Sequence, residues 1–473
     1  MTELSRLGPL PYSDIALAAC LLGLVALGNH IVRQFLRKDI VLRLAGFEWD
    51  RQCACQHFLI TGATGAGKTL SAVLPILIEF FRNQPRFGGL CIDVKGVLHE
   101  RVVEIARHHG RANDVLVLEV RPAEASPDWQ PRHRFNLVGD RSIPFATYAQ
   151  CVVDTAVALG NTNEQAFFRN AAQIHIAKAL EALDGAGLPV TLENAHNLLV
   201  NSDDTRAVLQ RLKLPEVAEH FRLYLAQPAE QLAGVVGTVR NYLHYFAQPG
   251  IAEVFCRDST FELRDVDAGK ILCIGLPQRL QTERRFVGTF LKHLFYIHAL
   301  NRYDRPKAQR DRHNLLLLLV DECQRFVTSS EHGLSDHSVV DIIREAKVCL
   351  VAATQSTTSL IPALGAEQAK VFTLNLRNRL IFTAADEDDA KASADFIGKR
   401  VGRDRTTGWS GGRFHQSTRN IDEHQIKPER LRGLGKHACV VVHCGKGHRK
   451  VVLPPREADG SVPVWFRTRW FRN

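Results

Sequence analysis

The sequence lacks the cysteine spacing of a disulfide-stapled or zinc-binding module. It holds 11 cysteines in 473 residues, and they are scattered, several of them within apolar runs. Buried free thiols in a reducing compartment fit this distribution better than a disulfide framework. Cys53-x-Cys55 has no partner pair at metal-ligand spacing, so the sequence predicts no metal site there. The chain also shows no internal repeat.

A strong charge imbalance is missing as well. Lys plus Arg number 60 against 50 for Asp plus Glu, a formal net charge of +10. This modest excess suits an anionic partner such as nucleic acid without establishing one. The length allows two or three domains with a full hydrophobic core.

Long hydrophobic runs are scarce, and the one that matters is residues 15–32. This uncharged stretch has 18 residues, barely enough to cross a bilayer core of about 30 Å. The basic cluster from Arg33 to Arg43 predicts that the C-terminal bulk is cytoplasmic. Asn29 and His30 favour the alternative, a buried or interfacial helix.

The motif around which the chain is organised lies in residues 57–72, HFLITGATGAGKTLSA. A short apolar run leads into a glycine loop of the form GxxxxGK(S/T), which is followed by a helical pattern. Such a loop turns its backbone N–H groups inward toward phosphate oxygens. We expect Lys68 to reach the β- and γ-phosphates of ATP and Thr69 to hold Mg²⁺. The predicted nucleotide-binding residues of the loop are Gly62, Ala63, Thr64, Gly65, Ala66, Gly67, Lys68 and Thr69.

A second acidic site follows the apolar run Leu315–Val320, which is typical of a central parallel strand. Asp321 and Glu322 come directly after it, at the carboxyl end where open α/β sheets bind ligands. We expect Asp321 to hold Mg²⁺ and Glu322 to orient and polarise the attacking water. The alternative is an acidic pair that only caps the strand or the next helix.

Two further strands end in polar residues. Residues 89–92 lead into Asp93, which is expected at the phosphates, the metal or a neighbouring subunit, although a strand-end salt bridge is an equal alternative. Residues 348–353 lead into Gln355, whose position at the tip of the adjacent strand suits a sensor of the γ-phosphate.

The pattern of the chain changes from strand-rich to helical between residues 143 and 256. Because the two nucleotide motifs lie on either side, this block is predicted to be an all-α insertion in an α/β core with a mostly parallel sheet. The predicted divisions are residues 1–40 as membrane anchor, 41–142 and 257–473 as the two parts of the core, and 143–256 as the insertion.

Two segments near the end of the chain leave alternatives open. Residues 399–419 mix basic residues with glycine, Trp409 and Phe414, which suits a loop that grips a nucleic-acid backbone and stacks bases, or a flexible surface hairpin. Residues 465–472 are aromatic and basic, and they fit docking of a partner, contact with lipid head groups, or packing on the core.

Taken in order, these motifs resemble the coupling proteins of type IV secretion, the membrane-anchored ATPases of conjugative DNA transfer. The resemblance covers nearly the whole chain. Its specific parts are, in sequence order, GATGAGKT at 62–69, DVKG at 93–96, VDECQRF at 320–326, REAKVCLVAATQS at 344–356 and LRGLGKHACVVV at 431–442.

The resemblance implies a RecA-like motor domain with an all-helical domain, assembled as a homo-hexamer with ATP between subunits. Arg344, eleven residues before Gln355, matches the family's arginine finger, and Gln355 matches its sensing glutamine. Without the resemblance, Arg344 is explained as a helix-surface salt bridge. The implied partners are relaxase-linked single-stranded DNA or a protein substrate, and the components of a type IV secretion channel. The chain departs from the family in its anchor, since many members have two membrane spans.

Two other functions fit the same residues. One is a different hexameric DNA translocase, of the chromosome-segregation or assembly-ATPase type. The other is a recruitment platform that binds ATP and a substrate protein and delivers cargo without moving along a strand.

Overall fold

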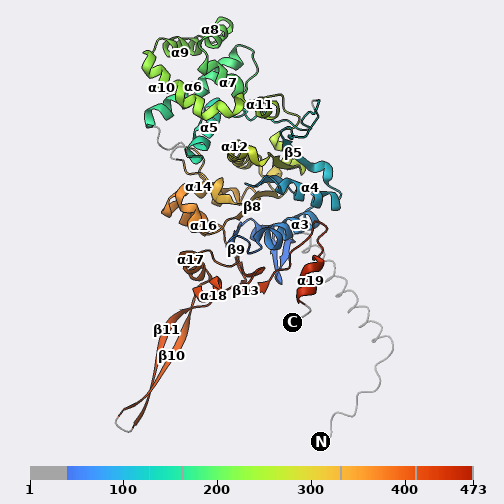
Figure 1. Ribbon diagram of the computed structural model, residues 1–473, viewed down its shortest axis with the longest axis vertical. Helices are drawn as coiled ribbons and strands as arrows, with labels where there is room; N and C mark the ends of the chain where they lie inside the picture. Colours follow the sequence, from blue (N-terminus) through green and yellow to red (C-terminus); the bar gives the residue numbers. More distant parts are fainter. Residues whose placement is uncertain (1–39, 127, 161–164, 331–332, 411–412, 471–473) are drawn as a thin grey trace, which may run out of the picture.

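The computed structural model describes residues 40–126, 128–160, 165–330, 333–410 and 413–470. Its centre is a nine-stranded sheet in the order β13-β12-β9-β3-β8-β7-β4-β6-β5 (Figure 1). The seven strands from β9 to β5 run parallel, whereas β12 and β13 form an antiparallel edge. This confirms the predicted α/β fold with a mostly parallel sheet. The strands are β3 (Phe58–Thr61), β4 (Gly88–Ile92), β5 (Val115–Glu119), β6 (Ile271–Gly275), β7 (Leu316–Val320), β8 (Val348–Ala353), β9 (Asn378–Ile381), β12 (Ala438–His443) and β13 (Gly447–Val452).

The continuous apolar run of β7 is explained by two cores, one on each face of the sheet. Leu316 and Leu318 belong to one buried cluster, and Leu317 and Leu319 belong to the other. Successive side chains of a strand point to opposite faces, so a strand covered on both sides is apolar at every position. The covering helices are α3 (Leu74–Asn83) and α4 (Leu98–His108) on one face, and α12 (Gln281–Asn301), α14 (Asp336–Ile343) and α16 (Ala366–Asn375) on the other.

The chain between β5 and β6 is helical, and the described part of it contains no strand. Its helices form the end of the molecule drawn at the top of Figure 1. Two of these helices, Pro215–Leu225 and Ala229–Leu243, separate at Pro228, because proline disfavours a helical conformation in the residue before it. The helices are α5 (Phe145–Ala158), α6 (Ala166–Gly185), α7 (Leu192–Val200), α8 (Ser202–Arg211), α9 (Pro215–Leu225), α10 (Ala229–Leu243) and α11 (Pro249–Phe255).

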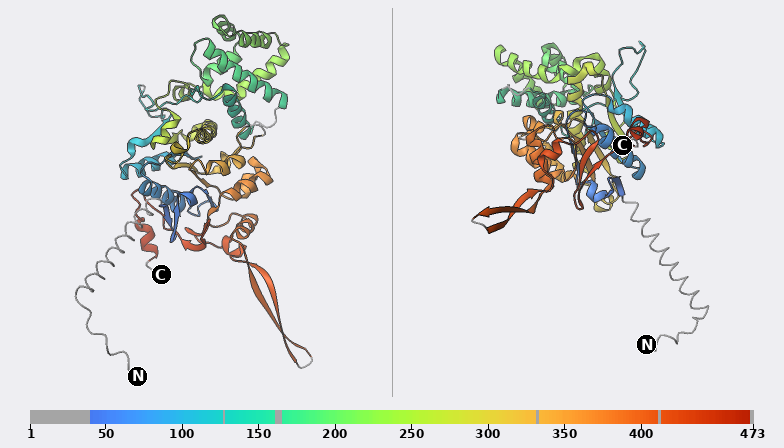
Figure 2. Two further views of the ribbon diagram at one scale, coloured as in Figure 1. Left: turned by 180° about the vertical axis from the view of Figure 1, so that it is seen from behind. Right: turned by 60° about the horizontal axis from the view of Figure 1, so that its bottom comes forward.

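A long β-ribbon projects from the opposite end of the molecule (Figures 1 and 2). It consists of β10 (Lys399–Ser410) paired antiparallel with β11 (Arg413–His424), in register from Lys399–His424 to Ser410–Arg413. The segment 399–419, predicted as a basic loop or a hairpin, therefore forms most of this ribbon. Its role in binding nucleic acid stays a prediction.

The two ends of the described chain lie against the core. A hairpin of β1 (Ile40–Leu44) and β2 (Phe47–Asp50) precedes the short helix α2 (Arg51–Ala54), and α19 (Val464–Trp470) closes the chain. Trp465 and Phe466 of α19 contact the ring of His437, which agrees with the prediction that the tail packs on the core. The predicted membrane segment 15–32 lies outside the described residues. Among the residues that are described, no helix combines the length and the apolar character that a membrane span requires.

Candidate nucleotide site

The glycine loop lies at the carboxyl edge of the sheet, held by its two neighbouring strands. The N–H of Gly62 donates to the Gln355 carbonyl at 3.1 Å, and the N–H of Ala63 donates to the Thr383 carbonyl at 2.7 Å. Gly62 and Gly67 have φ values of 151° and 104°. A Cβ at Gly67 would lie 2.6 Å from Nδ1 of His437, so both the backbone conformation and the lack of space require glycine there.

Lys68 folds over the loop toward the acidic side chains. Its ammonium donates to the carbonyl oxygen of Gly62 at 2.5 Å and to that of Ala63 at 3.3 Å. Burial lowers the pKa of Lys68, whereas the nearby Glu322 and Asp321 carboxylates raise it. The structure therefore brings together the lysine and the acidic pair, whose motifs are about 250 residues apart in sequence.

Asp321 forms the bottom of the site. Its N–H donates to the Ile92 carbonyl at 3.0 Å, which extends the pairing of β7 with β4, and its Oδ2 lies 3.4 Å from the Thr69 hydroxyl. Burial, together with the negative charges of Glu322 and Asp93, raises the pKa of Asp321 to about 6. A hydroxyl beside several crowded, desolvated carboxylates is a set of hard oxygen ligands that fits Mg²⁺.

Glu322 and Gln355 meet at the mouth of the site. Oε2 of Glu322 accepts hydrogen bonds from Nε2 of Gln324 at 2.6 Å and from Nε2 of Gln355 at 3.4 Å. Glu322 has a φ of 55°, a left-handed conformation that a non-glycine residue keeps only where its surroundings enforce it. The strand-end glutamine thus lies beside the carboxylate that is predicted to polarise water.

Asp93 has a different environment from the one predicted. Its Oδ2 accepts the N–H groups of Val97 and Leu98, at 3.2 and 3.3 Å, so the carboxylate caps the start of α4 instead of forming a salt bridge. Asp93 still lies close enough to Asp321 to raise the pKa of that group. Its contact with phosphate or metal stays a prediction.

Arg344 is far from the glycine loop of its own chain. Helix α14 ends at Ile343, and Arg344 is its exposed C-cap residue. The six residues of β8 separate it from Gln355, about 20 Å along a strand. None of the ion pairs found among the described residues involves Arg344. Its side chain lies at the amino edge of the sheet, where it faces outward.

Sequence reasoning missed three contributors to this site: Gln324, Thr383 and His437. His437 packs behind the glycine loop, where its N–H donates to the Ala66 carbonyl at 2.9 Å and its Nδ1 lies 2.8 Å from the Ser71 hydroxyl. The only signal was its place in the LRGLGKHACVVV stretch, to which no role was assigned. Gln324 lies two residues after Glu322 in the VDECQRF motif.

Solved structures that resemble this fold include a bacterial conjugative coupling protein and VirB4. The unbound bacterial conjugative coupling protein TrwBdeltaN70 gives a TM-score of 0.65 at 16% identity, over 89% of this chain and 90% of that one. TrwB in complex with ADP and Mg²⁺ gives 0.63 at 16% identity, over 89% and 92%. VirB4 of Thermoanaerobacter pseudethanolicus gives 0.53 at 13% identity, over 89% and 97%. At these identities the likeness concerns the fold.

Sequence comparison gives the family itself. Curated proteins give no significant match. The family described as "Type IV secretory system Conjugative DNA transfer" matches residues 22–446, which is most of the chain and includes all of the motifs above. The resemblance seen in the sequence is thereby confirmed: this chain belongs to the conjugative DNA-transfer family of type IV secretion.

Proposed function

We propose that this protein is a hexameric ATPase, anchored in the bacterial inner membrane, that uses ATP hydrolysis to recruit and translocate DNA or a DNA–protein substrate in conjugation. One observation carries the proposal. Lys68, Thr69, Asp321, Glu322 and Gln355 converge at one edge of a single sheet, whereas Arg344 is exposed at the other edge. Such a site is complete for binding a nucleotide and lacks only a cation that a neighbouring subunit can supply.

Each residue at the carboxyl edge has a defined role toward ATP. The loop 62–69 and the Lys68 ammonium bind the phosphates, and the hydroxyl of Thr69 and the carboxylate of Asp321 would hold Mg²⁺. A metal held there would supply neutralisation of the phosphate charge. Glu322 accepts a hydrogen bond from the attacking water and orients it, while Gln355, bonded to the same carboxylate, senses the γ-phosphate. The ATP-analogue and ADP–Mg²⁺ complexes of TrwB support this assignment.

The position of Arg344 supports assembly as a ring. Since about 20 Å of strand separates it from its own Gln355, it can act only on a nucleotide bound by an adjacent copy. A guanidinium supplied across an interface neutralises charge in the transition state and so couples hydrolysis to the geometry of the ring. In this proposal the core consists of residues 41–142 and 257–473, with 143–256 as the helical domain.

The cargo and location are proposed from the family. Relaxase-linked single-stranded DNA is the proposed substrate, components of a type IV secretion channel are the proposed partners, and residues 1–40 are the proposed membrane anchor. The β10–β11 ribbon and the net charge of +10 suit contact with a polyanion.

The deciding experiment measures ATP turnover by the full-length protein with and without single-stranded DNA, at increasing salt, with Lys68→Ala as the inactive control. The proposal expects strong stimulation by DNA, and DNA binding that weakens steeply as salt rises. Hydrolysis that ignores DNA, together with tight binding of one protein, would instead support a recruitment platform. Stimulation by double-stranded DNA alone would favour a translocase of the segregation type.

A further inference from the structure

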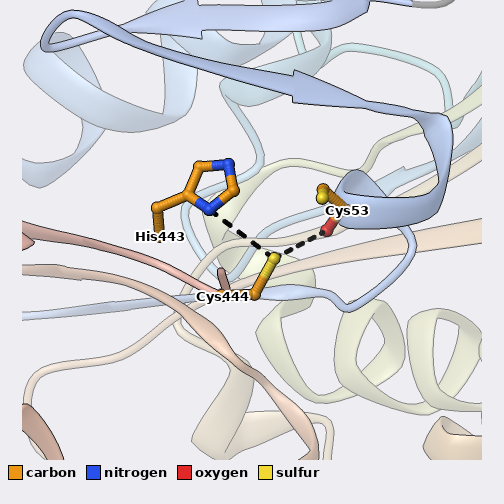
Figure 3. Close-up of side chains that lie close together, drawn as sticks. All are labelled: Cys53, His443 and Cys444. Carbon is orange, nitrogen blue, oxygen red and sulfur yellow. Dashed lines mark hydrogen bonds between the residues drawn. The ribbon is translucent and has the colours of Figure 1, made fainter. Parts of the chain in front are cut away.

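A cluster of two thiols and an imidazole lies at the opposite edge of the sheet from the nucleotide site (Figure 3). Cys53 belongs to α2, just before β3 begins, while His443 ends β12 and Cys444 follows it. One donor atom from each residue lies within 4.8 Å of the others. His443 is buried and both cysteines are half-buried, so the cluster borders solvent on one side.

The spacing of these atoms is close to that of a metal site. Sγ of Cys444 lies 3.8 Å from Nδ1 of His443, and the donor atoms of all three residues lie within 4.8 Å of one another. In tetrahedral zinc sites, bonds of about 2.3 Å to sulfur and about 2.0 Å to nitrogen place neighbouring ligand atoms about 3.6 to 3.8 Å apart. An ion can therefore be bound with small side-chain movements.

The imidazole of His443 is held in the orientation and tautomer that a metal ligand needs. Nε2 lies 3.1 Å from the carbonyl oxygen of Glu48, which can only accept, so Nε2 carries the proton and Nδ1 keeps its lone pair. The ring stacks on Trp49, with centroids 4.8 Å apart and planes at 24°. A second ring nitrogen that donates to a backbone carbonyl is the usual support of a metal-bound histidine. Metal binding would replace the hydrogen bond that Gly445 N–H donates to Nδ1 at 3.0 Å.

Asn378, the first residue of β9, fixes the backbone on both sides of the cluster. Its Nδ2 donates to the Cys53 carbonyl at 2.8 Å, and its Oδ1 accepts the Cys444 N–H at 3.0 Å and the Trp49 indole N–H at 2.7 Å. Asn378 is fully buried. A buried amide with these partners orders the two cysteine-bearing segments before any ion arrives.

We propose that Cys53, His443 and Cys444 bind one zinc ion, with water in the fourth, exposed position. Two thiolates and an imidazole are a soft ligand set that selects zinc over the magnesium of the nucleotide site. Binding releases two thiol protons, and the Asp50 carboxylate beside the Cys53 thiol adds a further negative charge. The ion joins the segment that enters the P-loop strand to the antiparallel edge of the sheet, 390 residues later.

The test is the zinc content of the full-length protein, purified under reducing conditions and equilibrated with ZnCl₂. Metal analysis is combined with Co²⁺ substitution, which reports tetrahedral thiolate ligation by its visible absorption bands. The variants are Cys53→Ser and Cys444→Ser, which keep the size of the side chain. The matched control is Cys55→Ala, since Cys55 is a buried thiol of the same segment that lies outside the cluster.

The proposal expects one zinc ion per chain in the wild type and in Cys55→Ala, and at least about tenfold weaker binding in each serine variant. Zinc should also raise the melting temperature of the wild type, but not that of folded Cys444→Ser. Three results would overturn the proposal: no zinc bound by the reduced wild type, zinc retained in both serine variants, or a Cys53–Cys444 disulfide in protein prepared with reductant. ATP hydrolysis is not part of the readout, so the outcome is independent of the proposed function.

Discussion

Replacing Asp321 with asparagine should make the metal-free protein more stable, although it removes a carboxylate that we propose holds Mg²⁺. Burial and the neighbouring carboxylates raise the pKa of Asp321 from 3.8 to about 6. A shift of about two units at about 1.4 kcal/mol each means that the ionised group costs about 3 kcal/mol in the folded state. Asparagine keeps an acceptor for the Glu322 N–H, and its amide can donate to the Thr69 hydroxyl.

The stability that Asp321→Asn gains over the wild type should depend on pH in a defined direction. Between the unfolded pKa of 3.8 and the folded pKa of about 6, the native state binds more protons, so the stability of the wild type falls as pH rises. The destabilisation by ionised Asp321 is complete above about pH 6. It disappears at low pH, where the carboxyl group is protonated in both the folded and the unfolded state. The advantage of Asp321→Asn is therefore about 3 kcal/mol near neutral pH and about 1 kcal/mol near pH 4.5.

The assay is thermal or urea unfolding of full-length wild type and variant in EDTA, without nucleotide, at the two pH values. Asp341→Asn is the matched control, because Asp341 is an exposed carboxylate on α14 and its replacement should change stability little. A variant less stable than the wild type, or a gain that is the same at both pH values, would refute the reasoning. The same variant should show no measurable ATP turnover with Mg²⁺.

Three further predictions concern the nucleotide site. Glu322→Gln should slow ATP hydrolysis about 10²- to 10⁴-fold in a turnover assay. Titration with a fluorescent ATP analogue should show that nucleotide still binds. Unchanged turnover would exclude Glu322 as the group that orients water. Gly67→Ala should lower both the melting temperature and ATP affinity, because the new Cβ meets His437 2.6 Å away at a φ of 104°, and normal affinity would mean that the loop adjusts freely. Arg344→Ala mixed with wild-type subunits should depress turnover more than dilution does, and a loss merely proportional to dilution would contradict action in trans.

The sequence was sufficient for the part of the site that depends on local order. A strand, a glycine turn and a helix must follow one another for the phosphate loop to form, so Gly62 to Thr69 could be identified without a partner. The apolar run before Asp321 likewise identified a central strand and placed its acidic pair at the carboxyl edge. The first inference used a contiguous motif, and the second used an unbroken apolar run.

Residues far apart in sequence needed the three-dimensional structure. Gln355 reaches Glu322 because β8 lies beside β7, and Thr383 supports the loop because β9 lies beside β3. His437, which precedes β12, supports the loop from further along the chain. Strand order is set by packing of the whole core, and no short stretch of sequence specifies it.

What the sequence by itself determined is the chemistry of the nucleotide site and the family, since contiguous motifs encode them. Only the tertiary structure decided where Arg344 and the cysteine–histidine cluster lie relative to that site. In the folded chain, Arg344 lies at the edge of the sheet away from its own phosphate loop. Cys53 lies beside His443 and Cys444, although the spacing of the cysteines predicted no metal site. The physical reason is that burial of a common core brings distant segments together, and a linear spacing rule detects only ligands that are neighbours along the chain.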